Sequence, residues 1–539
     1  MPAHAKISPR SLIDNGEADP RARPSMEELK AEALRLFEAL IGFALEGADD
    51  ARGCVTFKDY EQALVPRVFE FGRILLMLFL AAREDRLSSL TPQRLVRDGR
   101  TFRRRPAQPR NLNTFFGVVR YWRTYMRGDS LGGEGSRERS GFYPLDVAMG
   151  LTADRMSMYL VSLATRLATK LSFASAQATL GWFLLSAPSM EVIEQAVLGL
   201  GRRTGEWFER APAPEGDGDV LVIMFDGKAS PTATEEELQR RRGKRRPNPY
   251  PDSPRHRARD RRQLYGKKPR RKKGDKSKNG RSATMVVMYT LRREGEFLLG
   301  PLNRRVYASF APKRHAFEIA RREAEKRGFG RDSGKLIQIV TDGDDDLATY
   351  SKEFFPEAIH TIDVMHVVEY LWKAGECLHR EGTPELKVWV EKQKERLYSG
   401  AVDAIIAELR TRLGKVPVTG PGNKGRRERL EQVMNYLENR KEKLTYAELI
   451  ERDLEIGSGP VEGAVKHVIG ARFDHGGMRW IRERAEALLQ LRCIEINGDW
   501  ERFIDWVHDD MRASASRRGQ RLRLQEATPS PLPALAKAA

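Results

Sequence analysis

Short apolar runs that end beside an aspartate limit the possible folds of this chain more than any other feature. Runs of five or six apolar residues bounded by glycine or polar residues are typical of buried strands. Three such runs end beside an aspartate, and two further strand-like runs lie between the first and the second of these three. The strands that we infer are 220–225 before Asp226, 284–291, 305–310, 336–340 before Thr341 and Asp342, and 358–362 before Asp363.

Helical periodicity fills the intervals between the later strands, at 315–326, 345–355 and 364–378. The order β-β-β-α-β-α-β-α predicts a mixed sheet covered by helices, which is an α/β fold. A charged helical stretch at 384–450 interrupts this order. We therefore expect an inserted helical subdomain after the last strand.

Asp226 and Asp342 end two of these strands, on the side of an α/β sheet where ligands usually bind. Each alone is more typical of an Asp-Gly turn than of catalysis. If the strands are neighbours, the two carboxylates repel each other by roughly 4 kcal/mol at an effective dielectric of 20, so a cation is expected between them. Oxygen ligands favour Mg²⁺ or Mn²⁺, and a pair of such ions could activate water or a 3′-hydroxyl at a phosphodiester.

Glu462, on the first turn of a helix predicted at 460–472, is our candidate for the third ligand. Taken in isolation, a solvated glutamate favoured by the helix dipole fits that position better. Asp342 is preferred over the aspartates at 344–346, which we expect to cap the following helix. Asp363 and His366 lie three residues apart where a strand passes into a helix, so they can face the same cleft. A histidine that caps the sheet edge fits the position of His366 equally well.

The net charge of +19 points to a polyanionic partner. Most of it lies in a proline-rich insert at 240–281, with twenty Lys and Arg against three Asp, which we expect to be disordered until it meets nucleic acid. A solvated linker is the alternative. The candidate DNA-binding residues are Arg240, Arg241, Arg242, Lys244, Arg245, Arg246, Arg270, Arg271, Lys272 and Lys273 in the insert, and Lys466, Arg472, Arg479 and Trp480 near Glu462.

The N-terminal part has helical periodicity, including a capping box at Ser25 and Glu28. Two helices at 174–180 and 192–200 resemble a helix-turn-helix, a pattern that many bundles share. The segment 94–128 mixes arginines with aromatic residues, which could contact DNA or form a hairpin packed on a core. The domains that we expect are a disordered leader (1–24), a helical region (25–215), a core (218–380), a helical insertion (381–453), the end of the core (454–511) and a disordered basic tail (512–539).

Three dispersed cysteines indicate neither a disulfide framework nor a zinc ribbon. The longest apolar run, Ile74 to Ala82, is about half the length of a membrane span, and the N-terminus has no hydrophobic signal core. We expect a cytoplasmic protein without a membrane partner.

Four segments resemble the DDE-type insertion-sequence transposases with a ribonuclease-H-like core, nearest to the Kra-type bacterial group. They are VLVIMFDGKAS, IVTDGDDDL, AIHTIDVMHVVEYLW and GSGPVEGAVKHVIGARFDHGGMRW, in this order. The resemblance covers about residues 220 to 505 well and the preceding region loosely. It implies an α/β ribonuclease-H-like core with a helical insertion, preceded by an all-helical DNA-binding region. The basic insert and the aspartate run after Gly343 depart from the pattern of the group.

The resemblance further implies that Asp226, Asp342 and Glu462 are the metal-binding triad, with Asp363 and His366 as an accessory motif. The activity would be cleavage at the inverted repeats of a mobile element, which frees 3′-hydroxyls that are joined to target DNA, with two Mg²⁺ or Mn²⁺ ions per site. Bringing two ends together implies at least a homodimer in a bacterial, nucleoid-associated setting. The alternatives are a metal-dependent nuclease or resolvase of the same fold, and a DNA- or RNA-binding regulator that has lost the chemistry.

Overall fold

The computed structural model describes residues 23–48, 56–97, 100–128, 141–151, 155–233, 236, 281–474 and 480–518. The chain divides into two compact units. The first contains residues 1–196 and 501–539, and the second contains residues 197–500. The predicted leader lies almost wholly outside the described residues, as do the basic insert up to residue 280 and the tail beyond residue 518.

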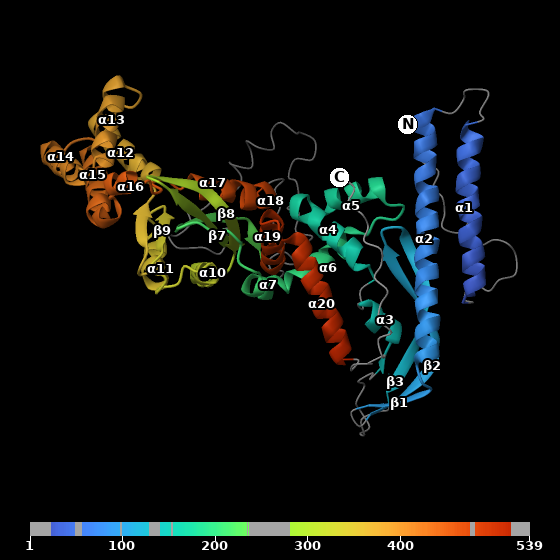
Figure 1. The fold of residues 1–539 in the computed structure, drawn as a ribbon. Coiled ribbons are helices and arrows are strands. Elements are labelled where there is room, and N and C mark those ends of the chain that lie inside the picture. The colour runs from blue at the N-terminus through green and yellow to red at the C-terminus, as the bar shows by residue number, and fades with distance from the viewer. Residues whose placement is uncertain are drawn as a thin grey trace. The chain divides into compact units, whose positions relative to one another are not determined.

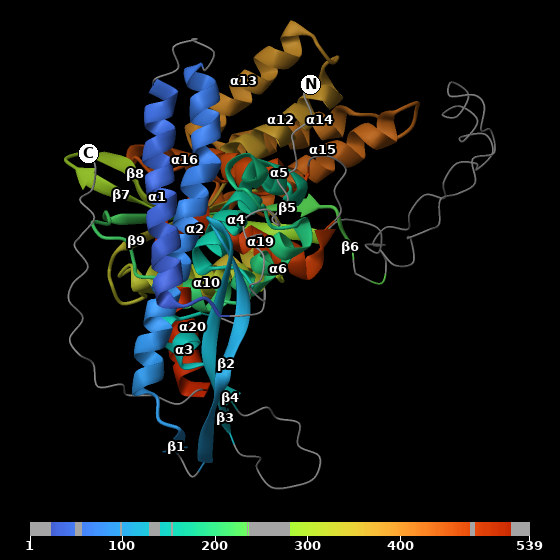
Figure 2. The same ribbon diagram turned by 90° about the vertical axis from the view of Figure 1, so that its right-hand side faces the viewer.

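The first unit begins with two long helices that lie side by side, α1 (Met26–Ala48) and α2 (Phe57–Leu90) (Figures 1 and 2). The predicted capping box is confirmed at the start of α1. The Ser25 amide donates to Glu28 Oε2 over 2.6 Å, and the Glu28 amide donates to Ser25 Oγ over 3.1 Å. These two bonds satisfy backbone donors that the first helical turn leaves unpaired.

The expectation of an all-helical N-terminal region is wrong, because this unit also contains an antiparallel sheet. Its strands are β1 (Arg94–Arg97), β2 (Arg100–Thr114), β3 (Gly117–Gly128) and β4 (Gly141–Phe142), in the order β1-β2-β3-β4. Leu112, Val119 and Tyr121 alternate with exposed residues and pack on α2. This period of two, and a glycine with φ of 101° at position 117, produce a hairpin packed on a core.

The other helices of the first unit are shorter than α1 and α2. Two of them, α5 and α6, are the two helices of the predicted helix-turn-helix. DNA binding by this pair stays a prediction. The two compact units divide the chain elsewhere than at the expected domain boundaries: α20 from Glu501 onward belongs to the first unit, and residues 197–215 belong to the second. The end of the core at residue 511 stays a prediction. The bounds are α3 (Pro144–Met149), α4 (Met158–Lys170), α5 (Phe173–Phe183), α6 (Met190–Gly201), α7 (Thr204–Arg210) in the second unit, and α20 (Trp500–Arg518).

The second unit is built on a mixed five-stranded sheet with the order β10-β9-β5-β7-β8. Strands β5, β9 and β10 are parallel, whereas β7 pairs antiparallel with both β5 and β8. All five predicted strands are present. Their bounds are β5 (Val220–Ser230), β7 (Arg281–Glu294), β8 (Phe297–Ser309), β9 (Leu336–Thr341) and β10 (Ile359–Ile362).

Helices cover both faces of this sheet (Figure 1). Phe225, Ile337 and Ile339 point to the face that packs on α10 (Lys313–Lys326) and α11 (Asp345–Phe354). The C-terminal helices lie over the other face, beginning with α17 (Gly459–Ala464), which contacts β5 and β7. They continue through α18 (Ala471–Phe473) to α19 (Arg482–Ile496).

The predicted insertion consists of helices α13 (Pro384–Tyr398), α14 (Val402–Lys415), α15 (Asn423–Glu438) and α16 (Tyr446–Glu451), with a 3₁₀ turn, η1 (Lys441–Lys443). Helix α12 (Val364–Leu378) leads from β10 into it and packs on α13 and α15. The buried Tyr446 hydroxyl donates to the Ile362 carbonyl over 2.8 Å. The insertion is therefore fastened to the end of β10.

No helix in the part of the chain that the structure describes is long and apolar enough to cross a membrane.

Candidate functional site

Three aspartates lie in a row across the parallel strands. Phe225 and Ile362 both pair with Thr341, so the residues that follow, Asp226, Asp342 and Asp363, are neighbours. The Asp363 amide donates to the Thr341 carbonyl over 2.8 Å, which extends this register beyond β10. Because Phe225 faces α10 and α11, Asp226 faces the opposite side of the sheet, toward α17.

The neighbouring carboxylates affect the pKa of Asp226. Burial raises its pKa, a hydrogen bond from the Gly227 amide lowers it, and the charges of Asp342, Glu462 and Asp363 raise it further. The Gly227 bond to Asp226 Oδ1 is 2.6 Å long. The predicted turn at this position is wrong, because β5 continues four residues beyond Asp226 to Ser230. The chain instead holds Asp226 within a strand that pairs with β9 up to Phe225 and with β7 as far as Ser230.

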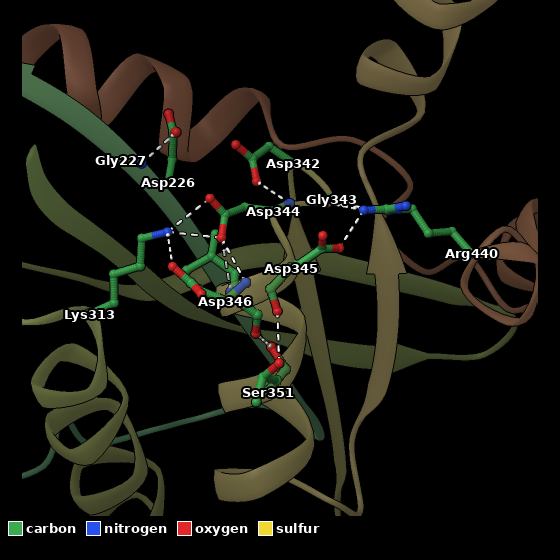
Figure 3. A network of polar contacts seen from close by, with 12 residues as sticks. Asp226, Gly227, Lys313, Asp342, Gly343, Asp344, Asp345, Asp346, Ser351 and Arg440 are labelled. Atoms are coloured by element: carbon green, nitrogen blue, oxygen red, sulfur yellow. Dashed lines mark hydrogen bonds and ion pairs between the residues drawn. The ribbon is translucent and has the colours of Figure 1, made fainter. Parts of the chain in front are cut away.

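The structure separates Asp342 from the aspartates that follow it (Figure 3). Asp344 caps α11 by accepting from the amides of Asp346 and Leu347, as predicted, and its pKa is lowered because Lys313 donates to both of its oxygens over 2.8 Å. Asp345 pairs with Arg440 and Asp346 with Lys313. The Asp342 side chain accepts only the Asp344 amide among the described residues, so Asp342 is the acidic residue of this run that has no cationic partner there.

Asp363 connects three elements. Its side chain caps α12 by accepting the Met365 amide over 3.0 Å, and it accepts the Ser458 hydroxyl over 2.8 Å. The Val364 amide donates to the Ile456 carbonyl beside it. With 3 % of its surface exposed, Asp363 has no room for a ligand of its own. It therefore fixes the loop that leads into α17.

Glu462 lies on the first turn of α17, as predicted, and its carboxylate is half exposed. Lys466 is 3.8 Å away on the next turn, a separation at the limit of an ion pair. The helix continues as a π-helical turn, Val465–Gly470, a form often found at functional sites. After α18, Asp474 pairs with Lys228 over 2.9 Å, which fastens this segment to β5.

A divalent cation is the group that the donor chemistry fits. Asp226, Asp342 and Glu462 offer only oxygen ligands, as Mg²⁺ and Mn²⁺ prefer, and their charges raise the pKa of Asp226. Among the described residues, no group of three Asp, Glu, His or Cys side chains lies close enough together to hold a metal ion. The half-exposed Glu462 would have to turn toward the two aspartates.

Tyr436 of the insertion is a candidate that sequence reasoning missed. Its hydroxyl is buried without a hydrogen-bond partner in the described structure, and a Cβ added to Gly343 would lie 2.6 Å from it. Burial raises the pKa of Tyr436, and the charges of Asp342 and Asp363 contribute to this increase. The ring stacks on Tyr370 at 3.8 Å. No sequence signal marks a tyrosine on a charged helix 94 residues after Asp342 as part of the same site.

His366, the second residue of the predicted accessory pair, lies half-buried beside these rings. Its ring centre is 5.7 Å from Tyr370 and 6.4 Å from Tyr436. Asp363 and His366 therefore have separate tasks: Asp363 fixes a loop, whereas His366 packs against the aromatic pair that carries the Tyr436 hydroxyl.

The residues predicted to bind DNA near Glu462 divide into two groups. Lys466 is exposed, as a DNA contact requires. Arg472 and Trp480 are 2 % and 6 % exposed, and the Arg472 guanidinium lies 4.6 Å from the Trp480 ring centre, so the structure contradicts their role as surface contacts. Burial lowers the pKa of Arg472 to about 10. The candidates Arg240 to Lys273 and Arg479 lie outside the described residues.

A row of arginines on the first unit's sheet is a second feature that sequence reasoning did not resolve. Arg103 of β2 pairs in register with Arg94 of β1 and with Arg127 of β3, and all three are exposed. Like charges directly opposite each other on a sheet are destabilising. Such a row is therefore typical of a surface that meets an anion.

A scan against protein-family models finds no match to this chain, and a search of curated proteins finds no significant one.

Proposed function

We propose that the chain is a DDE-type transposase that cleaves the ends of its own mobile element and joins the freed 3′-hydroxyls to target DNA. The observation that carries the proposal is the register that places Asp226 beside Asp342 at the end of two parallel strands, with Glu462 on a helix that contacts β5. Repulsion between acidic groups is tolerated where a bound cation offsets it.

The architecture supports a ribonuclease-H-like core. Three antiparallel strands are followed by two parallel ones in the order β10-β9-β5-β7-β8, and helices alternate with the later strands. The first two acidic residues lie on β5 and directly after β9, and the third lies on a helix that crosses the same face. A helical insertion separates the second and third acidic residues, as the resemblance implies.

In this proposal Asp226, Asp342 and Glu462 hold two divalent cations. When bound, these ions would supply the charge that activates the attacking oxygen and stabilises the leaving oxygen of a phosphodiester. Asp363 holds the Ser458 loop and so sets the position of Glu462. The Tyr436 hydroxyl is buried without a partner in the described structure, so a small movement of the insertion that exposes it would let it donate to a phosphate oxygen near Asp342.

Double-stranded DNA is the partner that the charges favour. The row of Arg94, Arg103 and Arg127 offers cations to successive phosphates, and the net charge of +19 supports a polyanionic partner. Joining two element ends requires at least two copies of the chain. We therefore propose a homodimer or higher assembly on DNA.

The test is a cleavage assay on labelled duplex that carries the DNA flanking the gene, with Mg²⁺ and unrelated target DNA. Wild type should produce 3′-hydroxyl ends joined to target, whereas Asp226→Asn and Asp342→Asn should produce none. Asp332→Asn, an exposed residue of the same unit, is the matched control and should retain activity. Cleavage without joining would indicate a nuclease or resolvase. Binding without cleavage would indicate a regulator.

A further inference from the structure

A polar cavity lies where the core meets the insertion, beside the β9–α11 loop. Its volume is about 150 Å³, which is large enough for a group the size of a benzene ring. The core and the insertion each contribute to its wall. The residues that matter here are Thr341, His360 and Ile362 from the core, and Asn439, Arg440 and Lys443 from the insertion.

Two cations line this cavity, and only one of them is paired. Arg440 donates to the Gly343 carbonyl over 3.1 Å and pairs with Asp345. Lys443 is partly buried, and its ammonium group has no hydrogen bond or ion pair among the described residues. Burial lowers the pKa of Lys443, and the neighbouring Arg440 lowers it further. A buried charge is costly unless a partner offsets it.

His360 closes the inner wall of the cavity without adding charge. Its Nε2 lies 2.9 Å from Thr341 Oγ1, and burial together with the charge of Lys443 lowers its pKa to about 3. At neutral pH the cavity therefore contains Arg440, Lys443 and Asp345 as its charged groups. This leaves an excess of positive charge facing a space that is large enough for a phosphate group.

We propose that this cavity binds a phosphate group through Lys443 and Arg440. Asn439 adds an amide that can donate a third hydrogen bond at the rim. Because the two cations belong to the insertion and the inner wall to the core, a bound phosphate would join the insertion to the β9–α11 loop that carries Asp342. The phosphate could come from a DNA backbone, in which case the inference rests on the proposed function, or from a free phosphate or nucleotide.

The first measurement is the melting temperature of the full chain in EDTA, with inorganic phosphate titrated against chloride at equal ionic strength. Phosphate should raise the melting temperature of wild type and of Lys441→Gln by a few degrees, since ligand binding stabilises the folded state. Lys441 is exposed on the same turn and serves as the matched control. Lys443→Gln should lose the response. Asn439→Asp, which places a negative charge at the rim, should lose it too, and serves if Lys443→Gln fails to fold.

The second measurement is DNA affinity as a function of salt concentration, which identifies the source of the phosphate. If a backbone phosphate occupies the cavity, Lys443→Gln should reduce the slope of log K against log salt by about 0.9, and Lys441→Gln should not. An unchanged slope together with the thermal response would assign the cavity to free phosphate or a nucleotide. An equal phosphate response in wild type, Lys443→Gln and Asn439→Asp would overturn the proposal. Neither measurement depends on cleavage, so an inactive enzyme would refute the proposed function and leave this test intact.

Discussion

Replacing Asp226 by Asn should stabilise the metal-free protein while abolishing cleavage. Asparagine has the same shape and can still accept the Gly227 amide, so the change removes charge and little else. Neighbouring strands are about 4.8 Å apart, and two unit charges at that distance repel by roughly 3 kcal/mol at an effective dielectric of 20. Because Asp226 is partly exposed, solvent screening reduces the expected gain to about 1 to 2 kcal/mol.

The direction of the pKa shift of Asp226 determines how the stability difference between the two proteins changes with pH. The pKa of Asp226 is raised in the folded state, so the folded protein binds more protons than the unfolded one as pH rises through that range. Its contribution to stability is therefore complete below the unfolded pKa and is lost as pH rises through the folded pKa. The advantage of Asp226→Asn over wild type should grow as pH rises above the ordinary pKa of an aspartate and level off above the folded pKa.

Scanning calorimetry of the full chain in EDTA measures this advantage. For a unit of this size, a gain of 1 to 2 kcal/mol corresponds to a rise of roughly 2 to 4 °C in the melting temperature. Added Mg²⁺ should then stabilise wild type more than Asp226→Asn. The control Asp332→Asn should follow wild type in both buffers. A lower melting temperature for Asp226→Asn in EDTA, or an equal Mg²⁺ response in the two proteins, would refute the argument from clustered charge.

Three further predictions concern other parts of the structure. Tyr436→Phe should preserve stability, because the stacked ring remains and only an unpaired hydroxyl is lost, while the cleavage rate constant falls by roughly tenfold with KM unchanged in kinetic assays. Replacing Arg94, Arg103 and Arg127 together by Gln should reduce the salt slope of DNA binding by up to about 2.7 in fluorescence anisotropy. Replacing His360 by Asn should reduce the loss of stability between pH 6.5 and pH 4 in urea titrations, because the lowered pKa of His360 makes acid favour the unfolded chain.

Each of these predictions has a control and a contradicting result. For Tyr436 the control is Tyr398→Phe at the end of α13, and a fall in melting temperature without a change in rate would assign Tyr436 a purely structural role. For the arginine row, Gln at the exposed Lys30, Lys58 and Arg86 removes the same charge from the same unit. An equal effect of both triple variants would show that only net charge matters. A pH profile of stability unchanged by His360→Asn would contradict the neutral, buried His360.

Local sequence patterns were sufficient to predict the five strands of the second unit's main sheet and helices α10, α11 and α12. Helix α12 begins and ends where the periodicity predicts, and β9 is one residue longer than the apolar run that reveals it. The strand containing Asp226 was predicted too short because Asp-Gly is a common turn, and only pairing with β7 keeps it extended. For the first unit's sheet, the sequence of 94–128 left a hairpin packed on a core as one of two interpretations, because its many arginines obscure the alternation of its apolar residues.

The candidate site was predictable where each residue follows a strand or opens a helix, as Asp342, Asp363 and Glu462 do. The place of Tyr436 in the site was not predictable. It depends on the contact between α15 and α12, which forms only when the insertion folds back and leaves no local sequence pattern. The burial of Arg472 was hidden for the same reason. An arginine in a basic segment is predicted to lie on the surface. In the structure the ring of Trp480 instead covers the Arg472 guanidinium.

The π-helical turn between Glu462 and Asp474 determines how the two ends of one helix are rotated relative to each other. A π turn holds one more residue than an α-helical turn, and one residue corresponds to about 100° of rotation. Glu462 can therefore face the aspartates while Asp474 faces Lys228 and Ser230. An unbroken α-helix would satisfy one of these alignments and lose the other. The extra residue thus lets a single segment serve both as a scaffold for a carboxylate and as a fastening to β5.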